Sequence, residues 1–282
     1  KLQTKNKELE TQNNTIEAHL YELEQKNMTI QAQLEDLKHK AAIDKELDMA
    51  KDIQKNILPQ EPPPIRGYHM DQLFIPAKQV SGDYYDYFPF SATKIGIVVA
   101  DIVGKGIPAS LMMIAFKGLM HRIATPDMGP SQTLSVLSDS IFLNKILGKY
   151  VPIIYGILDI KANTFTYSNA GHEPGVLLTA NGALKELNTG GFPLGMYETQ
   201  FYEEEVIQIE ISDRILLFTD GLTDIKSQSG NQLGIKGLKI LMQAHIDTPD
   251  NLFKSTVRSQ IIAYFKGVDQ VDDITLVSLR RK

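Results

Sequence analysis

The 282-residue sequence contains no cysteine. This absence excludes a disulfide framework, a zinc site built from thiolates, and catalysis by a cysteine nucleophile. No apolar run approaches the ~18 residues that a membrane span requires. The net charge of −5 also lacks the basic excess that is typical of nucleic-acid-binding proteins. We therefore expect no nucleic-acid partner and no direct membrane contact in this part of the chain.

The sequence starts at Lys1 and lacks both an initial methionine and a signal-peptide pattern. We interpret it as a piece of a longer cytoplasmic protein, whose preceding segment could still tether it to a membrane.

Glycine and proline are missing from the N-terminal fifth of the chain, where Pro59 is the first proline and Gly67 the first glycine. Aliphatic residues recur there every seven positions, at Leu2, Leu9, Ile16, Leu23, Ile30 and Leu37. A second series follows each by four residues, at Asn6, Asn13, Leu20, Asn27, Leu34 and Ala41. Placing the first series at heptad position d and the second at a predicts a parallel two-stranded coiled coil, because asparagine at a fixes the register of two strands. The pattern predicts a homodimer through residues 1–58.

Two roles for this helix stay open. It is either a helical spacer without chemistry or an element that transmits a signal to the rest of the chain. The second role is motivated by a shift of about one residue in the apolar series after Ala41, since such a phase break changes the local supercoil.

Prolines end the helix at Pro59 and stiffen the connector of residues 59–66. Residues 67–282 have a different sequence pattern. Short β-rich runs occur there at 71–76, 94–101, 151–160, 164–169, 176–178, 201–211, 214–219 and 274–279. Helical patterns cover 107–124, 131–147 and 249–266, the last after a Thr248 cap. Because strands come in runs and do not alternate with helices, we expect an α+β domain with antiparallel sheets.

Four aspartate motifs lie at strand ends or turns beside glycine or apolar residues. They are Ser81-Gly82-Asp83, Ala100-Asp101-Ile102, Thr219-Asp220-Gly221 and Asp272-Asp273-Ile274. Each alone is consistent with an ordinary turn or strand start. Together, carboxylates without cysteine or paired histidine suit Mg²⁺ or Mn²⁺, and a two-metal centre of that kind hydrolyses phosphoesters.

The order and the residues of these motifs resemble those of the metal-dependent type 2C protein phosphatase superfamily, and more closely those of its bacterial SpoIIE/RsbU branch. The resemblance extends from Ala50 to Arg280 and includes Tyr155-Gly156-Ile157, Asn169-Ala170-Gly171-His172 and Gly191-Phe192-Pro193. It implies a fold of two antiparallel sheets, sandwiched together and flanked by helices. It also implies a serine/threonine protein phosphatase in which water attacks phosphorus directly.

The resemblance also assigns site residues. It implies two Mn²⁺ or Mg²⁺ ions, bound by Asp83, Asp101, the backbone carbonyl of Ile102, Asp220 and Asp272, with Asp273 as a neighbour or alternative ligand. Lys78 and Lys105 are candidate contacts for the substrate phosphate, with a solvated lysine as the competing interpretation.

Two positions depart from the pattern of eukaryotic relatives. Val103 replaces the histidine proposed there as general acid, so a proton for the leaving group would come from water or another group. His172 replaces an acidic residue that supports a third metal in some relatives, and we expect it to close a turn instead.

The branch implies a phosphorylated STAS-type anti-sigma-factor antagonist as substrate, within a partner-switching pathway that is regulated through the coiled coil. It also implies a sensor or receiver domain upstream. One alternative is a catalytically silent dimeric signalling scaffold. A phosphatase or phosphodiesterase for small nucleotides ranks last, because no GxxxxGK[ST] loop occurs and the acidic composition offers nothing for polyanions.

Overall fold

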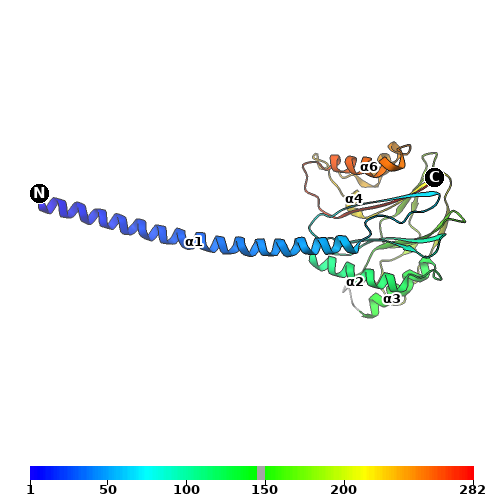
Figure 1. Ribbon diagram of the computed structural model, residues 1–282, viewed down its shortest axis with the longest axis horizontal. Coiled ribbons are helices and arrows are strands. Elements are labelled where there is room, and N and C mark those ends of the chain that lie inside the picture. Colours follow the sequence, from blue (N-terminus) through cyan, green and yellow to red (C-terminus); the bar gives the residue numbers. More distant parts are fainter. Residues whose placement is uncertain (145–149) are drawn as a thin grey trace. The chain divides into compact units, whose positions relative to one another are not determined.

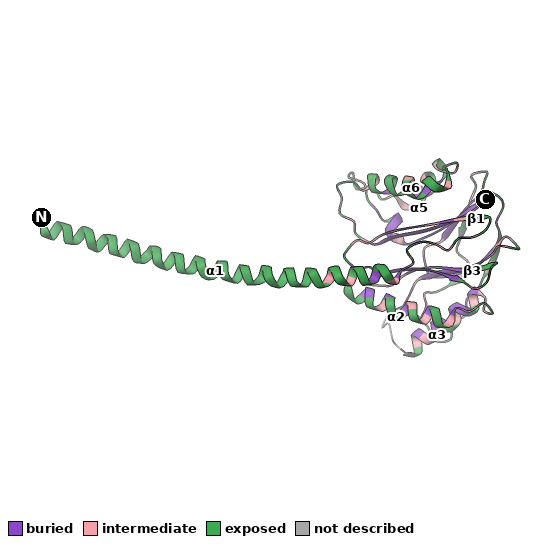
Figure 2. Ribbon diagram, viewed as in Figure 1, coloured by how far each residue is buried: buried purple, intermediate pink, exposed green. Residues whose placement is uncertain are grey.

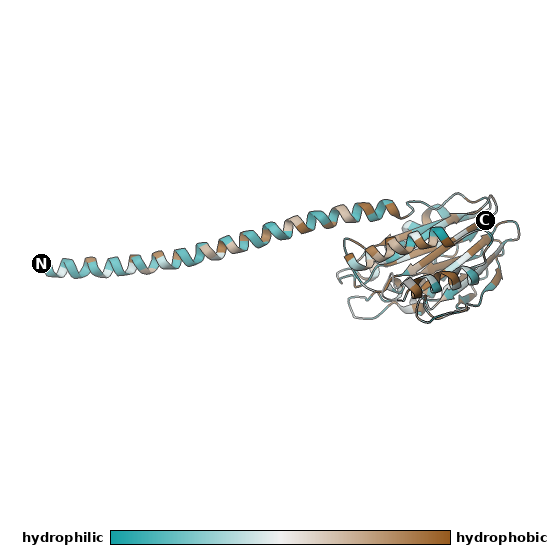
Figure 3. Ribbon diagram, turned by 90° about the horizontal axis from the view of Figure 1, so that it is seen from below, coloured by the Kyte–Doolittle hydropathy of each residue, from teal (hydrophilic) through white to brown (hydrophobic). Residues whose placement is uncertain are grey.

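The first unit of the protein is a single exposed helix. The computed structural model describes residues 1–144 and 150–282, and it divides into units of residues 1–50 and 51–282. Helix α1 (Leu2–Ile57) runs through the first unit, and residues 1–46 are all exposed (Figure 2). Hydrophobic positions recur along this helix between hydrophilic ones (Figure 3). The expected helix is present, and its pairing with a second chain stays a prediction.

The second unit contains two β-sheets. One has the strand order β1-β11-β10-β6-β7, and the other has the order β2-β3-β4-β5-β8, with β9 also paired to β5. The strands are β1 (Tyr68–Ile75), β2 (Asp83–Pro89), β3 (Lys94–Asp101), β4 (Ile153–Asp159), β5 (Thr164–Ala170), β6 (Gly175–Leu178), β7 (Leu184–Leu187), β8 (Gly190–Gly191), β9 (Glu205–Gln208), β10 (Arg214–Phe218) and β11 (Ile274–Arg281). Their pairing is antiparallel except for the two-residue contact of β5 with β8.

Helices cover the outer faces of both sheets (Figure 1). Helices α2 (Ile107–Ile123) and α3 (Pro130–Asn144) pack on the β2–β5 sheet, while α5 (Gly234–Ala244) and α6 (Asp250–Tyr264) pack on the other sheet. The α+β sandwich expected from the sequence is therefore confirmed. The last residues of the helix expected over 131–147 lie outside the described residues.

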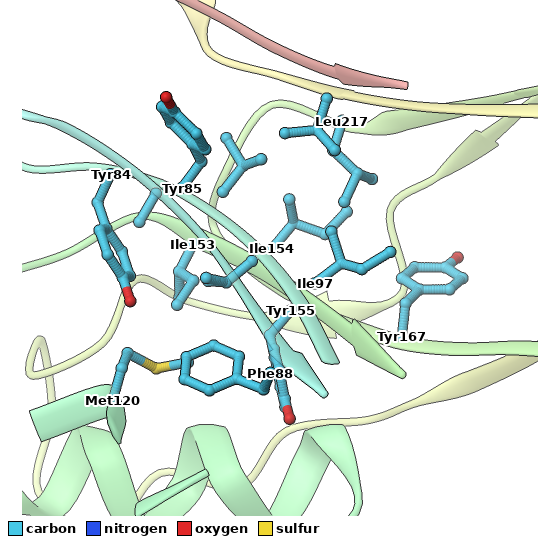
Figure 4. Close-up of a cluster of buried hydrophobic side chains, with 14 of the residues drawn as sticks. Tyr84, Tyr85, Phe88, Ile97, Met120, Ile153, Ile154, Tyr155, Tyr167 and Leu217 are labelled. Atoms are coloured by element: carbon cyan, nitrogen blue, oxygen red, sulfur yellow. The ribbon is translucent and has the colours of Figure 1, made fainter. Parts of the chain in front are cut away.

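Alternation along the strands divides the apolar residues between two cores. On β10, Ile215 and Leu217 face the core between the sheets, whereas Leu216 and Phe218 face α5 and α6. Figure 4 shows the first core, with Leu217 and Tyr85 lying between the sheets.

The aromatic run of β2 follows the same alternation. The ring of Tyr84 packs edge-on against Phe116 of α2, with centroids 5.7 Å apart, while Tyr85 packs against Phe74 of the opposite sheet. These tyrosines therefore pack on both faces of the sheet.

The last two turns of α1 are part of the second unit. Gln54 is buried and exchanges two hydrogen bonds with the backbone of Ser81, donating to its carbonyl at 2.8 Å and accepting from its N–H at 2.9 Å. Leu58 is also buried, and the hydroxyl of Tyr85 donates to the carbonyl of Pro59. These contacts fix residues 51–58 beside the segment that leads into β2.

In the part of the chain that the structure describes, no helix is both long enough and apolar enough to cross a bilayer.

Candidate active site

Asp83 and Asp101 lie directly opposite each other on neighbouring strands. Asp83 begins β2, Asp101 ends β3, and the two are paired in the antiparallel register. Since side chains directly opposite in such a pair lie about 5 Å apart at Cβ, the two carboxylates share one face at the end of the sheet. The strand ends therefore bring together two of the predicted ligands.

Two threonines from the other sheet complete the surroundings of Asp83. Its Oδ2 accepts hydrogen bonds from the hydroxyls of Thr219 at 2.8 Å and Thr275 at 2.5 Å, and no described group bonds to Oδ1. Thr219 follows β10 and Thr275 lies at the start of β11. One carboxylate thus connects the two sheets and keeps one oxygen available. Neither threonine was predicted from the sequence, although each stands in a motif beside a predicted aspartate.

The remaining aspartates approach from these same strand ends. Asp220 begins the short helix α4 (Asp220–Thr223) directly after Thr219. Its neighbour Gly221 lies so close to the next loop that an added Cβ would stand 1.8 Å from the carbonyl oxygen of Asp273. Glycine is needed here because only a residue without a side chain permits this backbone approach.

The carboxylates repel one another electrostatically. Burial, followed by the charge of Asp101, raises the pKa of Asp83 well above its ordinary value. Burial and then the charges of Asp220 and Asp272 raise the pKa of Asp101 to about 7. The pKa of Asp220 is raised too, by burial and then by Asp272. A cluster in which each anion disfavours the next is one that a cation would stabilise.

Asp272 and Asp273 have different surroundings. The Asp273 carboxylate is buried and accepts backbone hydrogen bonds from Ala77 at 2.7 Å and Gly82 at 3.1 Å. Both of its oxygens therefore hold the segment before β2. The Asp272 side chain is about one-third exposed and forms an ion pair with Lys105 at 2.7 Å. These contacts favour Asp272 as the ligand and a supporting role for Asp273.

The two candidate phosphate contacts both lie beside this cluster. Lys105 also donates to the carbonyl of Val271 at 2.9 Å, and its pKa is raised, chiefly by the hydrogen bond with Asp272. Lys78 is exposed and lines the same small crevice as Lys105 and Asp272. A phosphate entering there would meet two positive charges.

The donor set fits hard divalent cations, which prefer carboxylate and carbonyl oxygens. The buried residue Ile102 directs its carbonyl oxygen toward Gly82, at 2.8 Å from an ideal Cβ, and so places it near Asp83. As the side chains stand, no group of three or more His, Cys, Asp or Glu residues within 1–144 and 150–282 is arranged to hold a metal ion. Binding would require Asp272 to leave Lys105 and the carboxylates to turn toward a common centre.

The backbone of His172 forms hydrogen bonds that stabilise a turn. Asn169 accepts from the His172 N–H at 2.7 Å and donates to its carbonyl at 3.0 Å, and the imidazole is buried. Burial lowers the pKa of His172 to about 4. These contacts agree with the expected turn-closing role.

A buried anion outside the cluster was not predicted from the sequence either. Asp86 accepts hydrogen bonds from Tyr84 at 2.8 Å and His121 at 2.8 Å, and it pairs with Lys117. It ties β2 to α2 and contributes no free oxygen to the aspartate cluster.

Comparison with known proteins identifies relatives that cover most of the chain. The sequence model of the Stage II sporulation protein E (SpoIIE) family matches residues 91–282. The chain is 30% identical over 246 residues to the phosphoserine phosphatase RsbU of Bacillus subtilis, covering 85% of this chain and 71% of that protein. It is also 30% identical to the phosphoserine phosphatase RsbP of the same organism, of which it covers 45%.

A solved structure agrees with the fold. The SiaA-PP2C domain of Pseudomonas aeruginosa superimposes with a TM-score of 0.74 at 22% identity, covering 86% of this chain and 98% of that domain.

Proposed function

Because the chain belongs to the SpoIIE family of type 2C protein phosphatases, we propose that it hydrolyses phosphoserine or phosphothreonine on a regulatory protein in the cytoplasm, in a metal-dependent reaction. The observation that carries this proposal is the pair of Asp83 and Asp101 at one sheet end, met there by strand ends from the opposite sheet. Metal-assisted phosphoester hydrolysis uses a cation site of this kind with an open approach for phosphate.

Five groups of this chain would hold two Mn²⁺ or Mg²⁺ ions: Asp83, Asp101, the carbonyl of Ile102, Asp220 and Asp272. When bound, these ions supply the positive charge that lowers the pKa of water and polarises a phosphoryl group.

The other residues position the site and receive the substrate. Thr219 and Thr275 hold Asp83 Oδ2, so that Oδ1 points to a fixed place. Asp273 keeps Gly82 against the cluster through its backbone hydrogen bond. Lys105 and Lys78 would attract the phosphate dianion, and transfer of Lys105 from Asp272 to phosphate would free that carboxylate. With Val103 in place of a histidine, water or another group would protonate the leaving group.

The finer proposal concerns substrate and regulation. RsbU and RsbP are named phosphoserine phosphatases, and another solved relative joins RsbU and RsbW domains in one protein of Mycobacterium tuberculosis. We infer a phosphorylated STAS-type protein as substrate. A homodimer through residues 1–58 would orient two phosphatase domains under an upstream sensor or receiver domain.

The test is release of phosphate from a phosphoserine protein as a function of Mn²⁺ concentration. Asp101→Asn should lower the rate at least hundredfold, since it removes one charge from the centre of the cluster. Asp127→Asn is the matched control because Asp127 is exposed and lies outside the aspartate cluster; it should retain the full rate. Equal rates for native protein and Asp101→Asn would refute the assignment. A native protein without Mn²⁺-dependent activity would favour the silent scaffold.

A further inference from the structure

A second pocket lies next to the segment that carries Lys78. Its volume is about 380 Å³, which is within the range of ~300–1,000 Å³ typical of small-molecule sites. The end of α1, strand β1 and helix α6 form its walls, and Pro76 and Gln79 of the segment before β2 line it as well. All of these residues belong to the second unit.

Positive charge dominates this pocket. Lys51 and Lys55 line it from α1, and Lys254 and Arg258 line it from α6. Among the described residues that line it, none is Asp or Glu, and these four cations make no ion pair with any described residue. A net charge of −5 does not predict this local excess of positive charge.

Both cationic walls are held in place by buried contacts. Gln54 fixes the end of α1 to the backbone of Ser81. Helix α6 is anchored by Asp250, which pairs with Arg214 at 3.4 Å and Arg280 at 3.2 Å, and the Arg214 guanidinium lies 3.6 Å from the ring centre of Phe253. A ligand would therefore meet two helices that are already in place, so no cost of ordering these helices would reduce its affinity.

The spacing of the cations suits a chain of phosphates. Each pair is four residues apart on its helix, so its side chains leave the same face about 6 Å from each other. Arginine and lysine in such an arrangement recognise phosphate by charge-assisted hydrogen bonds.

The floor of the pocket is apolar and aromatic. Phe74 is partly exposed and packs against the buried ring of Tyr85, with centroids 5.8 Å apart, and Leu58 and Leu73 also line the site. An aromatic face beside a cationic rim suits a ligand with a flat ring at one end and several negative charges at the other. A pocket of this size suits a small molecule better than a peptide segment.

We propose that this pocket binds a nucleoside di- or triphosphate, with the phosphates between the two cation pairs and the base against Phe74. The site is separate from the aspartate cluster and does not depend on the proposed phosphatase activity.

The experiment is a titration of the full chain with a fluorescent nucleoside triphosphate in EDTA, so that no metal at the aspartate cluster can recruit phosphate. Saturable binding of one nucleotide per chain is expected. The double variant Lys254→Glu/Arg258→Glu should weaken binding at least tenfold, and Lys55→Glu on the other wall should weaken it severalfold. Lys236→Glu is the matched control, because Lys236 is exposed on the neighbouring helix α5 and does not line the pocket; it should change the affinity less than twofold.

Folding and ligand class are controlled separately. The melting temperature of each variant by circular dichroism should match the native one, because all the substituted residues are exposed. Inorganic triphosphate should compete more weakly than the nucleotide, since it cannot use the aromatic floor. Absence of saturation up to millimolar nucleotide, equal affinity in the double variant, or binding of a glutamate-rich peptide in place of the nucleotide would each overturn the proposal.

Discussion

The two units of this protein differ in the exposure of their hydrophobic side chains. In the helix of residues 1–50, Leu9 and Leu23 are 53% and 57% exposed, whereas Phe165 and Leu217 of the second unit are 0% and 1% exposed. Full burial of one such side chain is worth about 1.5–3 kcal/mol. The second unit gains this stabilisation from its own sheets and helices. We expect the helix to gain it by pairing with a second chain.

This difference separates two kinds of hydrophobic pattern. The seven-residue repeat of α1 marks a face without a partner within one chain, while the two-residue alternation of β10 marks a strand with a core on each side. The first pattern carries information about assembly, and the second carries information about folding.

The largest expected effect comes from the core of the second unit. Phe165 packs over Gly156, where an added Cβ would stand 2.2 Å from its ring. Phe165→Ala should therefore lower the free energy of unfolding by about 3–5 kcal/mol, because it leaves a large cavity. Leu9→Ala lies in the other unit and should change the free energy of unfolding of the second unit by less than about 0.5 kcal/mol. Guanidinium unfolding followed by near-UV circular dichroism measures both, and similar losses would contradict the division into two kinds of pattern.

The second prediction concerns assembly. Leu23→Lys places a charge at position d of the proposed seam and should weaken dimerisation at least hundredfold, or about 2.7 kcal/mol. Gln25→Lys introduces the same charge at the outer position f and serves as the control. Sedimentation equilibrium measures both dissociation constants. A native chain that remains monomeric, or a control that dissociates as readily, would remove the basis for the dimer.

Much of the fold was accessible from the sequence because local signals agreed with the tertiary ones. The absence of glycine and proline marked α1, and apolar runs ending in aspartate marked β3 and β10. Helix α5 was not predicted, since Gly234 begins it and Gly237 interrupts its pattern with a weak helix former. The expected cap of α6 by Thr248 is wrong: Pro249 occupies the cap position, and the Thr248 hydroxyl contacts His245 instead.

The site was accessible only in part, for a physical reason. Sequence motifs indicated which aspartates lie at strand ends, but hydrogen bonds between the sheets decide what each one does. The carboxylate of Asp273 accepts hydrogen bonds from the backbone N–H groups of Ala77 and Gly82, almost two hundred residues away in the sequence. No local sequence pattern encodes that contact. The threonine partners of Asp83 were hidden for the same reason.

The third prediction separates the adjacent aspartates. Asp273→Ala should destabilise the second unit by about 1–3 kcal/mol, because two backbone N–H groups, one of them buried, lose their acceptor. Asp272→Ala should cost less stability, since its carboxylate is partly exposed, yet weaken Mn²⁺ binding at least tenfold. Chemical unfolding and Mn²⁺ titration of the same two variants give the comparison. The reverse order of effects would assign the ligand to Asp273.

The smallest effect is a dependence of stability on pH that arises in the second unit alone. Burial and neighbouring carboxylates raise the pKa of Asp101 to about 7 from an ordinary value of 3.8, and the pKa of Asp83 and Asp220 is raised as well. The folded, metal-free protein therefore binds more protons than the unfolded chain between about pH 4 and 7, and its stability should fall as the pH rises through this window.

The melting temperature of the metal-free protein should thus decrease by several degrees from pH 5 to pH 8, measured by near-UV circular dichroism in EDTA. Asp101→Asn should reduce this slope, because it removes the group whose ionisation is disfavoured, and Asp127→Asn should leave the slope unchanged. Adding Mn²⁺ at pH 8 should restore the lost stability, since a ligand that binds only the folded state stabilises it by mass action. A metal-free protein that melts at higher temperature as the pH rises would show that Asp83, Asp101 and Asp220 do not repel one another. It would thus contradict the close approach of their carboxylates at the strand ends of the sandwich.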